Sequence, residues 1–395
     1  METLIADSAT ILSCAPQAQP PCEAARLALI CDFPEENWPS MDLVGEMLYE
    51  HLRHNGTVTP HRLRPAMKFA GSQPVMPARL VGRFVQYPRL LRRIVSDFDL
   101  FHIVDHSYAH LLHHLPHART VVTCHDLDTF RCVLDPDREK RSFAFRSMAR
   151  RILTGLESAA HIACASAATR DAILQHGILP AERLSVVHNG VHPLLSPNPD
   201  AAADGELARK LGRKPGSCAE LLHVGSTIHR KRIDVLLHIL AEVRKHHPGV
   251  RLIRVGAPFT SQQESLAHSL GVSRSIDVLH RLDTRLLGAC YRRASVLLQP
   301  SDAEGFGLPV IEALACGARV IASDIPPLRE TGGEVTTFCP VADVDSWTRA
   351  VLDVLATDES ANALHRLRAL EHASRFTWIN HAAGMAEIYR RVLAA

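Results

Sequence analysis

The stretch LLQPSDAEGFGLPVIEALACGARVIASDIPPLRE, residues 297–330, carries the pattern from which the fold is predicted. It opens with an apolar run, crosses a loop that contains Asp302, Glu304 and two glycines, continues as a helical segment from Leu308, and ends with a second apolar run. Two apolar runs separated by a helix-length segment are typical of parallel strands in one sheet. The stretch therefore predicts an α/β fold with a functional loop at the carboxyl end of a strand.

The same alternation of short apolar runs and longer amphipathic segments extends from this stretch in both directions. In the first half of the chain we predict strands at 27–31, 100–104, 120–124, 161–165 and 184–188, and helices at 42–53, 142–156 and 167–176. In the second half we predict strands at 220–224, 250–255, 276–279, 296–299 and 319–322, and helices at 230–246, 284–293, 308–316 and 345–355. Two such series predict two doubly wound domains, each with a parallel sheet.

A segment rich in proline and glycine separates the two series, and it sets the predicted domain boundaries. We predict a loose tail at 1–24, a first domain at 25–195, a linker at 196–217 and a second domain at 218–376. The closing segment TWINHAAGMAEIYRRVL, which begins at Thr377, has the apolar spacing of one amphipathic helix, predicted over 377–395.

Composition excludes several classes of protein. The chain has 395 residues, 46% of them hydrophobic and 22% charged, which is ordinary for a globular protein and excludes a disordered one. Its 44 Lys and Arg against 42 Asp and Glu leave a charge of +2, which gives no electrostatic case for a nucleic-acid partner. No run of about 18 apolar residues predicts a membrane span, and the opening residues lack the pattern of a secretory leader. Ten scattered cysteines without a C-x-x-C pair predict buried thiols in a cytoplasmic protein.

Two carboxylates stand beside the glycine-containing loop of the opening stretch. Glu304 lies in the loop, and Glu312 follows eight residues later in the predicted helix. Glycines at 305 and 307 allow the backbone amides to approach an anion, and carboxylates accept hydrogen bonds from vicinal hydroxyls. A sugar diphosphate offers both features. On spacing alone, a capped helix with two exposed acids is an equally good interpretation.

The segment EGFGLPVIEALACGARVIASD resembles the E-x7-E signature of family 4 of the retaining glycosyltransferases, which have the two-domain GT-B fold. HVGSTIHRKRIDVLLHIL, residues 223–240, is similar to a second segment of that family, and Phe376-Thr377-Trp378 resembles its closing segment. The resemblance implies two Rossmann-like domains that face each other across a cleft. It also implies a C-terminal helix that returns to the first domain.

The resemblance further implies roles for residues of the second domain. Arg230 and Lys231 are expected to hold the diphosphate of a UDP- or GDP-linked sugar, Glu304 to face the donor sugar, and Glu312 to bind the ribose. Two fixed cations can offset the charge of the leaving group, so no metal and no cofactor is expected. Ser226 occupies a position where relatives often have arginine. The other expected donor-binding residues are Gly225, Ser226, Gly305, Phe306, Gly307 and Leu308.

In the first domain, VVTCHDLDTF places a histidine just after a predicted strand. His125 resembles the cleft histidine of the family, which contacts the transferred sugar, and we group it with Glu304, Lys231 and Arg230 as a catalytic residue. The expected acceptor-side residues are Asp105, His106, Asp126 and Trp38. The loop 32–42 replaces the Gly-Gly loop of many relatives, so its role is left open.

Two further clusters have less defined roles. Histidines at 106, 110 and 114 have i,i+4 spacing, but no set of carboxylates or cysteines accompanies them, so no metal site is predicted. One basic segment is interleaved with apolar residues, a pattern that fits either peripheral contact with the inner face of a membrane or a solvated helix face. Its arginines are Arg79, Arg83, Arg89, Arg92 and Arg93.

Together these features predict a retaining glycosyltransferase of the hexosyltransferase type. It is expected to move a sugar from a nucleotide diphosphate to a hydroxyl acceptor, either soluble or lipid-linked, in the assembly of cell-surface polysaccharide or glycolipid. The resemblance implies front-face displacement. Two alternatives remain open: a nucleotide-sugar epimerase or hydrolase on the same fold, and a catalytically silent nucleotide-sugar-binding protein.

Overall fold

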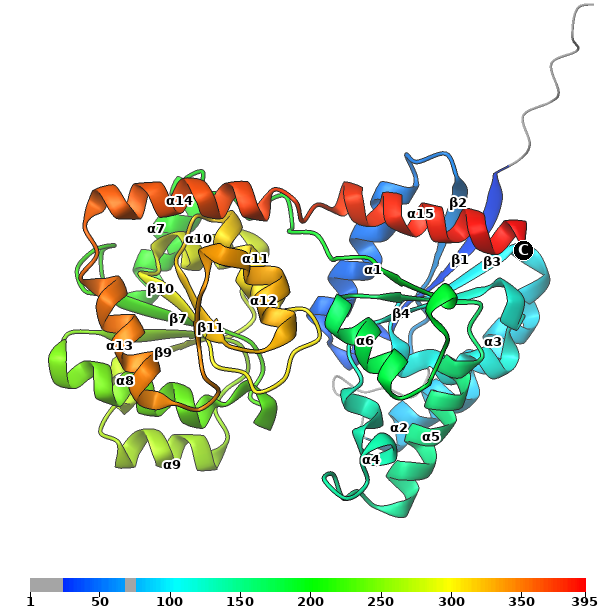
Figure 1. Cartoon of the computed structure of the whole chain (residues 1–395), viewed down its shortest axis with the longest axis horizontal. Coiled ribbons are helices and arrows are strands. Elements are labelled where there is room, and N and C mark those ends of the chain that lie inside the picture. The colour runs from blue at the N-terminus through cyan, green and yellow to red at the C-terminus, as the bar shows by residue number, and fades with distance from the viewer. Residues whose placement is uncertain (1–23, 68–75) are drawn as a thin grey trace, which may run out of the picture.

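The computed structural model describes residues 24–67 and 76–395, so the tail predicted at 1–24 lies outside the described residues except for its last position. Two α/β lobes lie side by side, and the chain crosses between them twice (Figure 1). Within the described ranges, no helix is both long enough and apolar enough to cross a membrane.

The first domain is built on a six-stranded parallel sheet with the order β2-β1-β3-β4-β5-β6. Its strands are β1 Ala25–Ile30, β2 Val58–Leu63, β3 Leu100–Ile103, β4 Thr120–Cys124, β5 His161–Cys164 and β6 Leu184–Val186. Its α-helices are α1 Pro39–Leu52, α2 Met76–Val81, α3 Tyr87–Ile94, α4 Arg131–Leu134, α5 Phe143–Glu157 and α6 Ala167–Gln175. The chain direction across the sheet reverses between β1 and β3, where ligands of such sheets bind.

The second domain has a six-stranded parallel sheet with the order β12-β11-β10-β7-β8-β9. Its strands are β7 Glu220–Val224, β8 Arg251–Val255, β9 Ile276–Leu279, β10 Val296–Gln299, β11 Val320–Ser323 and β12 Thr337–Cys339. Its helices are α7 Ala201–Leu211, α8 Ile233–His246, α9 Ser261–Ser269, α10 Thr284–Arg293, α11 Leu308–Ala315, α12 Pro326–Gly332, α13 Val344–Leu355 and α14 Glu359–Ala373. Here the chain direction reverses between β7 and β10.

These sheets confirm the predicted fold class, and every predicted strand is present. Strands β2 and β12 were not predicted; each is an edge strand of its sheet. β2 contains Pro60, which cannot donate a backbone hydrogen bond and is therefore tolerated only at an edge, and β12 has only three residues. Neither strand has the apolar run by which the buried strands were found.

The predicted linker at 196–217 needs correction, because this segment contains helix α7. Leu207 and Leu211 of α7 belong to the hydrophobic core of the second domain, and Asp204 forms an ion pair with Arg292 of α10 at 2.6 Å. The prolines before the helix and the glycines after it gave the segment the composition of a linker. The structure makes it part of the second domain.

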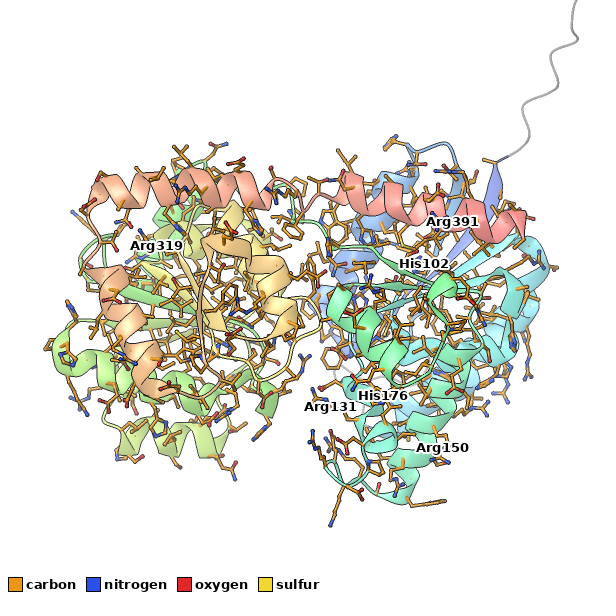
Figure 2. The ribbon with its side chains drawn as sticks, viewed as in Figure 1. His102, Arg131, Arg150, His176, Arg319 and Arg391 are labelled. Carbon is orange, nitrogen blue, oxygen red and sulfur yellow. The ribbon has the colours of Figure 1, made fainter. Side chains whose placement is uncertain are left out.

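Helix α15, Trp378–Ala394, returns to the first domain as expected and lies beside α1 (Figure 1). Met385 and Tyr389 are fully buried, and they pack with β1 residues such as Leu29. The Tyr389 hydroxyl is hydrogen-bonded to Nδ1 of His102 at 2.7 Å, beneath the helix (Figure 2). The other ring nitrogen of His102 is 2.8 Å from the hydroxyl of Thr123, so both ring nitrogens are satisfied. Burial lowers the pKa of His102 to about 3, which keeps the ring neutral.

We expect Tyr389→Phe to destabilise the first domain by about 1–3 kcal/mol, because it leaves a buried ring nitrogen of His102 without a partner. Denaturant-induced unfolding measures the change. Tyr49→Phe is the matched control, since its hydroxyl makes no hydrogen bond among the described residues, and we expect a change of less than about 0.5 kcal/mol. Equal effects of the two substitutions would contradict the proposed contribution of this contact.

Candidate active site

The loops that follow β7 and β10 meet where the second sheet reverses direction, and Glu304 is their central residue. Its side chain is only 6% exposed. One carboxylate oxygen, Oε1, is 2.5 Å from Nζ of Lys231 and accepts hydrogen bonds from Gln299 at 2.6 Å and Ser301 at 2.7 Å. Gln299 and Ser301 were not predicted, although both stand within five residues of Glu304 in the motif.

The neighbouring cations fix the charge of Glu304. Burial opposes ionisation, but the charges of Lys231 and Arg230 and the hydrogen bonds from Lys231 and Ser301 outweigh it and lower the pKa of Glu304. The carboxylate is therefore ionised at neutral pH. It can accept hydrogen bonds from a ligand but cannot donate a proton to one.

Arg230 connects the two domains. Its guanidinium lies 3.3 Å from Glu304 of its own domain, and 3.5 Å and 3.2 Å from the carboxylates of Asp126 and Asp128 in the first domain. It also donates a hydrogen bond to the carbonyl of Ala303 at 3.0 Å. Burial disfavours the charge, yet the surrounding carboxylates raise the pKa of Arg230. An anion that bound Arg230 would therefore compete with acids from both domains.

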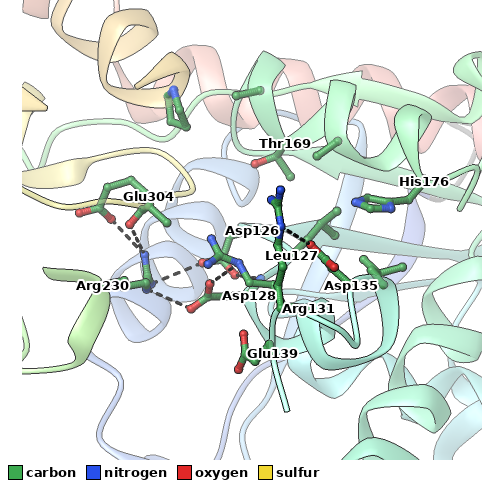
Figure 3. Close-up of a pocket in the computed structure, with 16 residues that line it drawn as sticks. Asp126, Leu127, Asp128, Arg131, Asp135, Glu139, Thr169, His176, Arg230 and Glu304 are labelled. Atoms are coloured by element: carbon green, nitrogen blue, oxygen red, sulfur yellow. Dashed lines mark hydrogen bonds and ion pairs between the residues drawn. The ribbon is translucent and has the colours of Figure 1, made fainter. Parts of the chain in front are cut away.

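A cavity of about 490 Å³ opens at this point between the domains (Figure 3). Arg230 and Glu304 line it from the second domain, and Asp126, Asp128 and Arg131 line it from the first. Charged groups from both domains thus face one open cavity. Five carboxylates and three arginines line the cavity, so it can form many hydrogen bonds with a ligand that is rich in hydroxyls, and Arg230 is the cation that it shares with Glu304.

Gly305 is where the two domains approach most closely along the motif. A Cβ atom at this position would lie 1.9 Å from the carbonyl oxygen of His125, so only glycine fits. The Gly305 carbonyl accepts a hydrogen bond from the hydroxyl of Ser166 in the first domain at 2.7 Å. Gly305 was predicted to bind the donor; the structure adds an interdomain contact that the resemblance did not imply.

His125 lies on the first-domain side of this contact and is buried. Its Nε2 is 2.9 Å from the carbonyl of Val104, which can only accept, so Nε2 carries the proton. Burial lowers the pKa of His125, although the nearby carboxylate of Asp105 opposes that effect. The ring is therefore neutral, with Nδ1 as its free acceptor.

The predicted acceptor-side residues Asp105, His106 and Asp126 lie together beside His125. Nδ1 of His106 accepts the backbone N–H of His125 at 3.3 Å, and Nε2 lies 3.7 Å from Asp126. Burial opposes ionisation of Asp105, but His106, His125 and hydrogen bonds from Ser107 lower its pKa to about 2. Burial and the neighbouring carboxylate of Asp105 raise the pKa of Asp32, which was not predicted.

Trp38, the fourth predicted acceptor-side residue, stands at the start of α1. It is 48% exposed, which is unusual for a tryptophan, and it does not line the cavity. Of the four predicted acceptor-side residues, only Asp126 lines the cavity; Asp105 and His106 lie beside His125, and Trp38 is at the surface.

Glu330 of α12, which was not predicted, forms a second interdomain contact. Its carboxylate accepts hydrogen bonds from the backbone N–H of Ala167 at 2.8 Å and 2.9 Å, at the start of α6, and it lies 2.5 Å from Nε2 of His188. The two helices face each other across the boundary between the domains (Figure 1). A carboxylate at a helix N-terminus is favourable because it complements the unpaired amides and the helix dipole.

The remaining donor-side residues are placed as follows. Glu312 of α11 is buried and accepts a hydrogen bond from Tyr291 at 2.7 Å, and burial raises its pKa. Gly307 precedes α11 with a φ of 96°, a conformation that favours glycine. The ring of Phe306 packs between the domains against Phe376. Gly225 and Ser226 follow β7 and Leu308 begins α11, and none of these six residues lines the cavity.

The predicted membrane-contact surface needs partial correction. Arg83 is mostly buried, forms an ion pair with Glu36 at 2.5 Å and stacks on Tyr108 at 4.1 Å. It therefore stabilises the first domain and is not available to a membrane. Arg79 is half-buried, whereas Arg89, Arg92 and Arg93 are exposed.

The histidine cluster shows no metal-binding geometry. Residues 106–114 form a 3-10 helix, in which i,i+4 positions do not share a face, and His110 is buried against the backbone carbonyl of Arg83. Among the described residues, no group of three or more His, Cys, Asp or Glu side chains is arranged to hold a metal.

Two facing Rossmann-like domains with charged loops at both carboxyl edges define the GT-B class. The family model described as "Glycosyl transferases group 1" matches residues 206–367, and "Glycosyltransferase Family 4" matches residues 52–193. The chain belongs to this family, the group 1 (family 4) glycosyltransferases.

Known proteins agree with this membership. A D-inositol 3-phosphate glycosyltransferase of Segniliparus rotundus is 31% identical over 233 residues, which cover 56% of this chain and 50% of the relative. The chain thus spans about half the length of the curated relatives it matches. A sucrose-phosphate synthase of Thermosynechococcus elongatus has the same fold, with a TM-score of 0.75, 21% identity and coverage of 94% and 99% of the two chains. HepE of Anabaena, solved with UDP and glucose, gives a TM-score of 0.69 at 16% identity, with coverage of 92% and 99%.

We expect Gly305→Ala to force the domains apart, because the added methyl group would overlap the carbonyl of His125. Small-angle scattering should show a larger radius of gyration, and the free energy of unfolding should fall by about 1–3 kcal/mol. Gly249→Ala is the control, since nothing lies within 4 Å of a Cβ there. An unchanged scattering profile and unchanged stability of Gly305→Ala would refute this account of the interdomain contact.

Proposed function

We propose that this protein is a retaining glycosyltransferase that moves a sugar from a nucleotide diphosphate to a hydroxyl acceptor. The observation that carries the proposal is the ion-paired cluster of Arg230, Lys231 and Glu304, of which Arg230 and Glu304 line the cavity between the two GT-B domains. Cations suit the diphosphate of the donor and an ionised carboxylate suits the hydroxyls of its sugar. The first domain contributes the acceptor side.

In the proposed reaction, the bond between the anomeric carbon and the diphosphate oxygen breaks while the acceptor oxygen bonds to the same face of that carbon. The acceptor proton passes to the departing phosphate oxygen. Negative charge accumulates on the leaving diphosphate, and Arg230 and Lys231 stabilise it. Glu304 holds Lys231 in place through the 2.5 Å contact and accepts a hydrogen bond from the sugar.

His125 has a supporting role in this proposal. Because Nε2 donates to the carbonyl of Val104, only Nδ1 is available to a ligand, and it can accept a hydrogen bond from a hydroxyl of the transferred sugar. A neutral imidazole would not repel the positive charge that develops on the sugar in the transition state. The lowered pKa of His125 supports that role.

We propose that turnover needs no divalent metal, since Arg230 supplies positive charge at the cavity and Lys231 supplies it beside Glu304. Asp343-Val344-Asp345 has the spacing of a metal-binding motif in other glycosyltransferases. However, Asp343 accepts hydrogen bonds from the backbone and the hydroxyl of Ser346, at 3.2 Å and 2.6 Å, and so caps α13. That use of its side chain favours a structural role.

The proposal also covers the donor substrate, the acceptor and the place in the cell where the protein acts. HepE, which shares the fold, is known with UDP and UDP-glucose, and this supports a UDP-hexose donor here, with GDP-hexose as the alternative. We propose that the protein is cytoplasmic and glycosylates a precursor of cell-surface polysaccharide or glycolipid. In this proposal the exposed arginines of α3 lie near a membrane. Product analysis distinguishes it from an epimerase or hydrolase, and any acceptor-dependent turnover excludes a silent binding protein.

We expect Lys231→Ala to lower kcat/KM about 10²-fold, equivalent to about 3 kcal/mol, because it removes a cation that stabilises the leaving group. Nucleotide diphosphate release from UDP- and GDP-hexoses measures the rate. Lys231→Arg should rescue poorly, because a planar guanidinium does not replace a compact ammonium against Glu304. Lys245→Ala is the control, since it removes an exposed lysine of α8, which follows the same loop.

Wild-type activity should persist in excess chelator. Glu304→Gln should also lower kcat, whereas Glu312→Gln should mainly weaken donor binding. If chelator abolished turnover and magnesium or manganese restored it, the roles proposed for Arg230 and Lys231 would be wrong.

A further inference from the structure

A buried arginine in the second domain has no acidic partner among the residues that the structure describes. Arg254 of β8 is 0% exposed, and within residues 24–67 and 76–395 no carboxylate forms an ion pair with it. One guanidinium nitrogen, Nη2, donates to the carbonyl of Gly225 at 2.8 Å. The other two, Nε and Nη1, have no hydrogen-bond partner in that part of the chain. A buried cation with two unpaired donors destabilises a fold, so its presence calls for an explanation.

The surroundings of Arg254 place its charge at the end of the sheet where the donor is proposed to bind. Its hydrogen-bond partner Gly225 begins the loop that carries Lys231, and the side chain of Lys231 passes 3.8 Å from where a Cβ of Gly225 would be. Gly256 directly follows β8, and a Cβ atom at Gly256 would lie 2.2 Å from Nη1 of Arg254. The backbone is therefore shaped to admit the guanidinium beneath the Gly225 turn.

Among the described residues, no neighbouring group neutralises this charge. His223, the partner of Arg254 in the β7–β8 register, is fully buried, and burial together with the charges of Arg254 and Lys231 lowers its pKa, so it stays neutral. The ring of Phe259 lies 5.8 Å from the guanidinium carbon. Glu304, the acid bound to Lys231, is shared with Arg230. Arg254 therefore adds a further cation to a loop where Glu304 pairs with Arg230 and Lys231 and the charge of Asp302 also acts on Arg230.

We propose that Arg254 is a positioning residue for the donor, whose diphosphate its buried charge attracts from beneath the Gly225 turn. The inference rests on the proposed function, because it requires an anionic ligand at the loop after β7. Arg254 does not touch the ligand. It fixes the carbonyl of Gly225 and adds a positive potential that acts through a poorly screened interior, alongside the direct contacts of Lys231.

Calorimetric titration with UDP and GDP, and with uridine and guanosine as uncharged probes, tests the proposal. Arg254→Met should weaken binding of the nucleoside diphosphate about tenfold and leave nucleoside binding unchanged, because only the diphosphate senses the lost charge. The difference should shrink as ionic strength rises. Arg254→Lys, which keeps the charge, should retain most of the diphosphate affinity. The apo form of Arg254→Met should melt no lower than wild type, since an unpaired buried charge is removed.

Arg319→Met is the matched control. Arg319 directly precedes β11, at the amino end of the strands of the same sheet and away from the cleft (Figure 2), and it donates a hydrogen bond to Asn362 at 2.7 Å. Arg319→Met should leave the affinities for the nucleoside and for the nucleoside diphosphate unchanged. Equal losses for nucleoside and diphosphate in Arg254→Met, or unchanged diphosphate affinity, would overturn the inference. If the methionine variant does not fold, Arg254→Gln gives the same comparison. If the wild-type protein bound neither UDP nor GDP, the proposed function itself would be wrong.

Discussion

The contact between the backbone of Gly305 and the carbonyl of His125 is the constraint on which the rest of the site depends. Loops that follow parallel strands all leave a sheet at the carboxyl ends of its strands. Because these ends of the two sheets face each other, the functional loops of both domains meet in one narrow space. The acids after β4 thereby reach Arg230 on the loop after β7. Neither domain alone contains this arrangement, because each holds only part of the charge set.

Within that space, the cations proposed to bind the ligand form ion pairs with carboxylates of the protein itself. Arg230 is surrounded by three carboxylates, and Lys231 is held by Glu304, which two neutral side chains also fix. The acids keep the cations oriented, and the cations keep Glu304 ionised despite its burial. A diphosphate therefore meets groups whose positions need little rearrangement, although it must displace carboxylates that already neutralise part of their charge.

Much of the fold and the centre of the site could be predicted because both follow from local patterns. Apolar runs mark the buried strands, and the spacing of Glu304, Glu312 and the Arg230-Lys231 pair identifies the family. What escaped prediction depends on tertiary contacts: β2 is a strand only because it pairs with β1, and α7 is held by the core of the second domain. Glu330 and Arg254 acquire their importance from partners distant in sequence, which no local pattern reveals.

The return of α15 to the first domain also has a consequence for how the protein forms during synthesis. One face of the first sheet, with Leu29 and Val121, is covered by α1 and by Met385 and Tyr389 of α15, so part of this face stays uncovered until the ribosome has released the segment 378–394. The second domain, which lies between these parts of the chain, can complete its own core earlier. The first domain begins to form first but finishes last, and until then its apolar face is open to chaperones or to aggregation.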